Sequence, residues 1–271
     1  MKTNFSLYKI DNETNFGFCP TEYSKFKFGD DSLAEKFGTE LANAFIEEVL
    51  KKIVINEQIV VIPSPYSFIP TATFAMKNYF VFGINRWLAS NNLPIVQTAK
   101  IHRTITYKDD YGALNADERM ALIGNDGFYV DKIFLENKIL IFLDDIKITG
   151  SHEKMITKML DDFGINNDIY LLYFAELVNK SIHPKIENHL NYYFVKSLLE
   201  VDNIVKSDTF TFNTRVVKYI LNAGENDFIF FINDKSIKFF FVNSIIDTPG
   251  SIGFLSRIYM RNPFADNYTL F

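Results

Sequence analysis

Three short apolar runs, each followed by a helical pattern, constrain the fold of this 271-residue chain more than any other feature. The runs cover residues 58–62, 138–143 and 168–174, and a weaker run covers 95–101. They are continuously apolar rather than alternating, which is typical of strands that are buried on both faces. Apolar strands that alternate with helices indicate a parallel sheet with helices on both sides. We therefore predict an α/β fold.

Helical spacing of apolar residues predicts the segments between these strands. Helices are expected from about 30 to 52, from 71 to 89 and from 151 to 163. After about residue 180 the alternation stops, and the pattern predicts helices alone. The expected helices after that point are 197–205, 214–222, 236–244 and 251–260, and a short helical patch is expected earlier, at 115–123 between two strands. We predict an α/β domain over residues 1–180, including an N-terminal extension, and a mostly helical region over 181–271 packed on it.

Composition and charge narrow the class of protein. Hydrophobic residues make up 48% of the chain and charged residues 23%, which is enough apolar material for a sizeable core. The net charge of −5 argues against a protein that coats nucleic acid or an anionic membrane. No apolar run approaches the roughly 20 residues that span a bilayer. The single cysteine, Cys19, fits a reducing compartment. We expect a cytoplasmic protein with no nucleic-acid and no membrane partner.

The junction after the run 138–143 carries the clearest chemistry. Asp144 and Asp145 follow that run directly, and Thr149-Gly150-Ser151 precede the next predicted helix. Ligands of open α/β sheets bind at the carboxyl ends of strands. Carboxylates there can hold ribose hydroxyls or magnesium, while N–H groups at a helix start bind phosphate. Together they fit a sugar phosphate. The alternative is a solvated strand end followed by an ordinary helix cap.

The string from Leu143 to His152 resembles the phosphoribosyl-pyrophosphate (PRPP) motif of type I phosphoribosyltransferases. Residues 100–104, 114–119 and 127–130 precede it with a spacing similar to that of ComF-like phosphoribosyltransferases. Residues 22–30 resemble the opening of the branch of this family that is associated with the tellurite-resistance (ter) operon.

The resemblance implies a Rossmann-like type I phosphoribosyltransferase core with a mostly helical C-terminal region. It also implies an enzyme that transfers the phosphoribosyl group of PRPP to a nitrogenous base and releases pyrophosphate. Asp144 and Asp145 would then be the catalytic pair, contacting ribose and holding Mg²⁺ directly or indirectly. The expected 5′-phosphate loop is Ile148, Thr149, Gly150, Ser151 and His152. The candidates for pyrophosphate binding and for the family's mobile hood over 104–127 are Ser64, Tyr66, Ser67, Arg103 and Arg119.

Two departures from the family pattern keep a second hypothesis open. Ile148 stands where many members carry Thr or Asp, and His152 stands where the loop usually closes with Thr. The alternative is a catalytically silent PRPP- or nucleotide-binding regulator on the same fold. Arg103 and Arg119 have ordinary surface roles as their alternatives. The acceptor base and the oligomeric state, with a homodimer as one option, stay open.

Overall fold

The computed structural model describes residues 2–66, 69–103 and 128–222. The chain divides into two compact units, Met1–Asn222 and Ala223–Phe271, and the first unit contains all of the described residues. Within the described ranges, no helix is long and apolar enough to cross a membrane.

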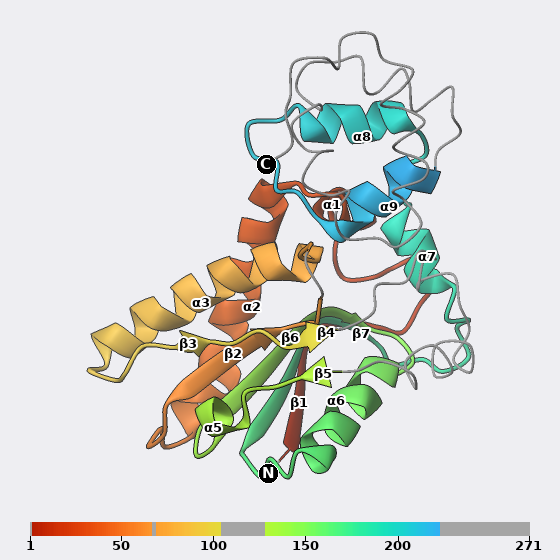
Figure 1. Cartoon of the computed structure of the whole chain (residues 1–271). Coiled ribbons are helices and arrows are strands. Elements are labelled where there is room, and N and C mark those ends of the chain that lie inside the picture. Colours follow the sequence, from red (N-terminus) through yellow and green to blue (C-terminus); the bar gives the residue numbers. More distant parts are fainter. Residues whose placement is uncertain (1, 67–68, 104–127, 223–271) are drawn as a thin grey trace, which may run out of the picture. The chain divides into compact units, whose positions relative to one another are not determined.

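A five-stranded, fully parallel sheet forms the centre of the first unit (Figure 1). Its strands, in spatial order, are β1 (Lys2–Ile10), β7 (Ile169–Leu177), β6 (Ile139–Lys147), β2 (Ile59–Pro63) and β3 (Gln97–Thr98). The central strands β6 and β2 are buried along nearly their whole length. Strand β4 (His102–Arg103) pairs separately with β5 (Phe128–Tyr129) in an antiparallel ribbon.

Helices cover both faces of the sheet, because side chains point to both faces in turn and the central strands are apolar on each face. Ile141 and Leu143 of β6 pack into the core under α2 (Asp31–Glu48) and α3 (Ala72–Ser90). Leu140 and Phe142 pack into a second core under α6 (Ser151–Asp162). The remaining helical elements are α1 (Pro20–Lys27), the 3₁₀ turn Leu50–Lys52, α5 (Lys132–Leu135), α7 (Ile186–Asn191), α8 (Leu198–Val205) and α9 (Thr214–Asn222).

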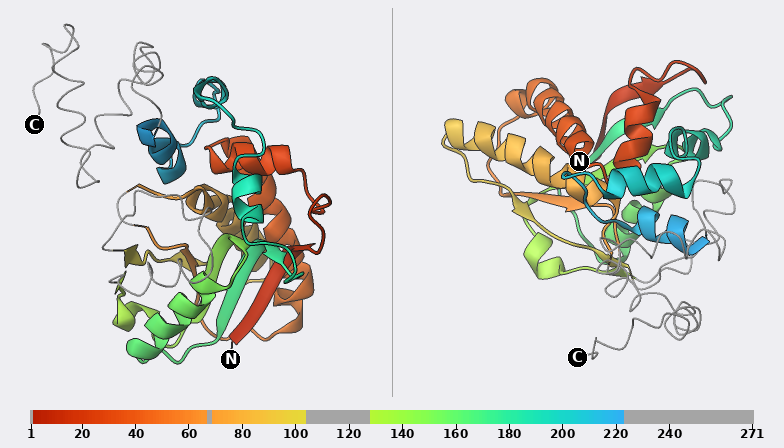
Figure 2. Two further views of the ribbon diagram at one scale, coloured as in Figure 1. Left: turned by 90° about the vertical axis from the view of Figure 1, so that its right-hand side faces the viewer. Right: turned by 90° about the horizontal axis from the view of Figure 1, so that it is seen from above.

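The helices α1, α7, α8 and α9 lie beyond the carboxyl ends of the strands (Figures 1 and 2). Hydrogen bonds join α1 to the segments that follow it in this layer. Ser24 donates to the carbonyl of Asn191 at 2.8 Å, and the side-chain amide of Asn213 donates to the carbonyl of Lys27 at 3.2 Å. The layer therefore borders the edge of the sheet where the acidic pair was expected.

The predicted parallel α/β architecture is confirmed, and the helices expected at 197–205 and 214–222 are present as α8 and α9. Two strand predictions need correction. The run 95–101 forms only the two-residue strand β3, because the chain leaves the sheet and enters the ribbon at His102. Strand β6 does not end before Asp144 but continues to Lys147, because β7 remains paired beside it.

Several predictions fall on residues that the structure does not describe. The helices expected at 115–123, 236–244 and 251–260 lie outside the described residues, as does the expected hood over 104–127. The division between two regions at about residue 180 stays a prediction.

Candidate active site at the end of strand β6

The two aspartates of β6 contact different helices. Both lie within β6, and Asp144 pairs in register with Tyr173 of β7. The Asp144 side chain bonds to His152 of α6, and the Asp145 side chain bonds to Tyr23 and Lys27 of α1. Both aspartates are buried, with 9% and 5% of their surface exposed.

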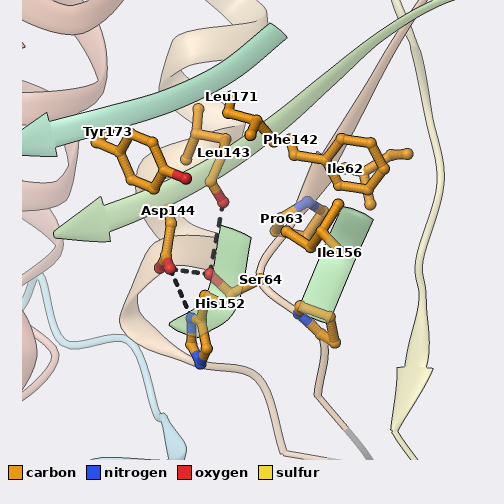
Figure 3. A pocket seen from close by; sticks show the side chains of 11 residues that line it. Ile62, Pro63, Ser64, Phe142, Leu143, Asp144, His152, Ile156, Leu171 and Tyr173 are labelled. Carbon is orange, nitrogen blue, oxygen red and sulfur yellow. Dashed lines mark hydrogen bonds and ion pairs between the residues drawn. The ribbon is translucent and has the colours of Figure 1, made fainter. Parts of the chain in front are cut away.

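The Asp144 carboxylate is held by four polar groups, two of which, Ser64 and His152, are drawn in Figure 3. One of the others is the Thr73 hydroxyl of α3, which donates to Oδ1 at 3.5 Å. His152 Nδ1 lies 2.8 Å from Asp144 Oδ2, and the Ser64 hydroxyl donates to Oδ1 at 2.5 Å. The backbone N–H of Asp145 also donates to Oδ1, at 2.9 Å. Burial raises the pKa of Asp144, but these hydrogen bonds and the charge of His152 outweigh it and hold the pKa well below its usual range. Asp144 is therefore a carboxylate at neutral pH.

The Asp145 carboxylate has two partners of its own, Tyr23 and Lys27 of α1, and shares Thr73 of α3 with Asp144. Its Oδ2 accepts a hydrogen bond from the Tyr23 hydroxyl at 2.5 Å and forms an ion pair with the Lys27 ammonium group. Thr73 of α3 donates to Oδ1 at 3.3 Å. Burial and the adjacent Asp145 charge raise the pKa of Tyr23 well above its usual value, so its hydroxyl remains a donor.

The expected phosphate loop forms the turn into α6. Gly150 is the residue before the helix and has φ of +74°, a left-handed conformation that glycine adopts without a Cβ penalty. The hydroxyls of Thr149 and Ser151 lie 2.7 Å apart, and the Ser151 N–H points to the Thr149 hydroxyl at 3.4 Å. The Ile148 side chain packs against the core beside α2 and α3. In this state the loop is capped by its own hydroxyls.

A small pocket opens on the α6 face beside Asp144 (Figure 3). Its polar lining consists of Ser64, Asp144 and His152, and its apolar wall includes Phe142, Ile156, Leu171 and Tyr173. Asp145, Thr149 and Gly150 do not belong to this lining. Of the predicted site residues, the structure therefore brings Ser64, Asp144 and His152 together around one pocket.

The remaining predicted residues lie around the neighbouring loop or outside the description. Tyr66 forms a β-bridge with His102, which joins the loop after β2 to the ribbon, and the Lys100 ammonium group lies 4.1 Å from the centre of the Tyr66 ring. The backbone of Arg103 lies in β4. The side chain of Arg103 and all of Ser67 and Arg119 fall outside the described residues.

Sequence reasoning missed Tyr23, Lys27 and Thr73, which contact the acidic pair. Lys27 lies 118 positions before Asp145, and no local pattern links the two. The only signal was the stretch 22–30, which includes both Tyr23 and Lys27 and was noted for its family resemblance alone.

The donor set of the acidic pair does not fit a protein-held metal ion. The carboxylate oxygens accept hydrogen bonds from Ser64 and Tyr23, and they pair with the cationic side chain of Lys27 and with His152. In the part of the chain that the structure describes, no group of three or more His, Cys, Asp or Glu residues could hold a metal ion. Their surroundings thus do not support direct coordination of Mg²⁺ by Asp144 and Asp145, and an indirect contact stays a prediction.

The parallel sheet with helices on both faces defines an α/β protein, and its acidic strand end lies at the carboxyl edge, where ligands of such sheets bind. A family model described as ComF-like phosphoribosyltransferase matches residues 1–267, so the chain belongs to the ComF-like phosphoribosyltransferase family. No curated protein matches the chain.

Solved structures similar to this chain include three purine phosphoribosyltransferases. A hypoxanthine phosphoribosyltransferase from Staphylococcus aureus has 12% identity and a TM-score of 0.35, over 54% of this chain and 66% of that one. A hypoxanthine-guanine phosphoribosyltransferase from L. donovani has 12% identity and a TM-score of 0.32, over 54% and 72%. The hypoxanthine phosphoribosyltransferase of Trypanosoma cruzi has 14% identity and a TM-score of 0.32, over 56% and 68%. The chain thus spans just under two thirds of the S. aureus structure.

Proposed function

We propose that this protein binds PRPP at the pocket beside Asp144 and transfers its phosphoribosyl group to a nitrogenous base, with release of pyrophosphate. Membership of the ComF-like family supports phosphoribosyl transfer in general. The observation that supports placing PRPP at this pocket is the buried Asp144 carboxylate, which faces the pocket next to the first turn of α6.

In the proposed reaction, a base nitrogen forms a bond to the sugar's C1 while the bond from C1 to the pyrophosphate oxygen breaks. Positive charge develops on the ribose ring, and the bonding electrons leave with pyrophosphate. The fixed negative charge of Asp144 stabilises that developing charge and accepts hydrogen bonds from ribose hydroxyls. The 5′-phosphate would sit at the N-terminus of the 12-residue helix α6, where N–H groups and the helix dipole favour an anion. The Thr149 and Ser151 hydroxyls would then exchange their mutual hydrogen bond for phosphate oxygens.

Magnesium would enter with PRPP, and this proposal assigns the ion to the substrate rather than to the acidic pair. The chain's part is to bind the sugar, orient C1 and exclude water. His152 lies next to Asp144 and at the start of α6, so it can also donate a hydrogen bond to the phosphate.

Asp144→Asn tests this assignment, because it keeps the shape of the side chain and removes its charge. We expect pyrophosphate release from PRPP and a panel of purine and pyrimidine bases to fall at least about 100-fold, the size of effect seen when one charge-stabilising group is removed. Asp161→Asn is the matched control, since Asp161 is an exposed residue of α6 and should retain full activity. Equal turnover in the two variants would contradict the site.

A second candidate function is a silent PRPP- or nucleotide-binding regulator. It is favoured by the Ser64 hydroxyl, which already bonds to Asp144, and by the partly buried Ile148 side chain at a position where a hydroxyl or carboxylate is common in the family. A PRPP-dependent rise in melting temperature, together with no pyrophosphate release for any base, would support the regulator over the enzyme.

A further inference from the structure

We propose that Lys27 is the permanent counter-ion of Asp145, so that Asp145 anchors helix α1 while Asp144 alone of the pair meets the ligand. The ligand half of this statement rests on the proposed function. The first half rests on the ion pair itself and can be tested without any ligand.

The two carboxylates have mostly different partners, although the Thr73 hydroxyl contacts both. Asp144 bonds to Ser64 and His152, whereas Asp145 bonds to Tyr23 and Lys27 of α1. Asp144 lines the pocket on the α6 face, whereas Asp145 does not line it. A ligand in this pocket would therefore meet Asp144.

Asp145 and its partners form a buried polar cluster. Its side chain and that of Lys27 are only 7% and 12% exposed, and Tyr23, which donates to the same oxygen, is fully buried. Two unpaired charges would be very costly at such a depth, so each requires the other. The carboxylate is neutralised by a cation that the chain supplies itself.

The ion pair also explains how α1 is positioned. The helix is held from its other side by the hydrogen bonds of Ser24 to Asn191 and of Asn213 to the Lys27 carbonyl. Lys27 and Tyr23 are its polar contacts to β6. Lys27 is thus a positioning residue that fixes the layer α1, α7 and α9 against the strand end that carries Asp144.

A thermal double-mutant cycle tests the ion pair. Lys27→Met and Asp145→Asn should each lower the melting temperature, because each leaves a buried group without its partner. The double variant should melt above both single variants. Lys27→Arg, which keeps the charge, should melt above Lys27→Met. The control is the exposed pair Lys36–Glu22, with side chains 45% and 34% exposed, where Lys36→Met and Glu22→Gln should have additive, small effects. Additive effects at Lys27 and Asp145 would overturn the proposal.

A ligand titration on the same proteins tests the division of roles. The probes are PRPP with Mg²⁺ and ribose 5-phosphate, which has the hydroxyls and 5′-phosphate without the pyrophosphate. The Lys27→Met/Asp145→Asn protein should bind both within about threefold of the wild-type affinity, a difference well under 1.4 kcal/mol, while Asp144→Asn should lose binding. If the folded double variant loses binding as fully as Asp144→Asn does, Asp145 contacts the ligand and the proposal fails. If neither probe binds wild type, the proposed function is contradicted, and the thermal cycle still decides the ion pair.

Discussion

At the scale of single residues, the site is organised around a buried carboxylate that is hydrogen-bonded within the protein. Asp144 accepts from Ser64, from a backbone N–H and from His152 while only 9% of its surface is exposed. A buried charge is tolerated only when it is hydrogen-bonded in this way. Ser64 therefore stabilises the buried Asp144 carboxylate, in addition to its expected role in binding pyrophosphate.

Ser64→Ala should destabilise the protein, because it removes a hydrogen bond to a buried charged group. The expected loss in the free energy of unfolding is about 1.5–3 kcal/mol, measured by urea denaturation. Ser90→Ala is the control, since the exposed Ser90 hydroxyl has only local partners, the carbonyl of Trp87 and the side-chain amide of Asn91, and its loss should cost less than about 0.5 kcal/mol. A loss at Ser64 no larger than at Ser90 would show that water replaces the hydroxyl without cost.

At the scale of elements, polar side chains connect β1, β7, β6 and α6 along one edge. Glu176 of β7 pairs with Lys9 of β1 at 2.6 Å and with Lys147 of β6 at 3.0 Å. Lys147 also pairs with Glu153 of α6 at 2.8 Å. Burial raises the pKa of Glu176, but hydrogen bonds from Lys9, Ser6 and Lys147 outweigh it and lower the pKa to about 2.

This depressed pKa predicts how stability depends on pH. The unfolded chain binds a proton at Glu176 near pH 4.5, whereas the folded protein resists protonation down to about pH 2. The stabilisation from Glu176 is therefore complete above pH 4.5 and is lost as the pH falls to 2. The difference in unfolding free energy between wild type and Glu176→Gln, measured by urea denaturation across this range, should shrink steadily toward low pH. A difference that stays constant would contradict the depressed pKa.

The crossing of α2 and α3 depends on a glycine that helix propensity alone would disfavour. A Cβ at Gly38 would lie 2.4 Å from the carbonyl oxygen of Met76 and 2.9 Å from the Cβ of Tyr79. Gly38→Ala should therefore lower the melting temperature, although alanine is favoured in a helix interior by about 1 kcal/mol. Gly38→Val should lower it further. A rise in melting temperature for Gly38→Ala would show that the helices move apart easily.

At the scale of the whole molecule, the sequence predicted the strands that are buried on both faces and missed the edge strand that is buried on one face. The runs that became β2, β6 and β7 were recognisable because central parallel strands are continuously apolar. Strand β1 was not predicted, because an edge strand with one exposed face carries residues such as Lys2, Asn4 and Lys9. The acidic pair was found because its residues are adjacent in sequence, but the separate surroundings of the two aspartates could not be. They depend on the register of β6 beyond Leu143 and on α1, which reaches Asp145 only through the tertiary fold.

The parallel pairing of β1 with β7 has a consequence for the order of events during synthesis on the ribosome. Lys2 pairs with Ile169 and Ile10 with Leu177, so the first strand to be made has no partner in the sheet until β7 has emerged. Contacts this distant along the chain close late and slow the folding of a domain. Until then the half-apolar β1 segment is an unpaired strand edge, the kind of surface on which nascent chains associate wrongly. Lys2 and Lys9 place positive charges on β1, and such charges oppose edge-to-edge association before the sheet is complete.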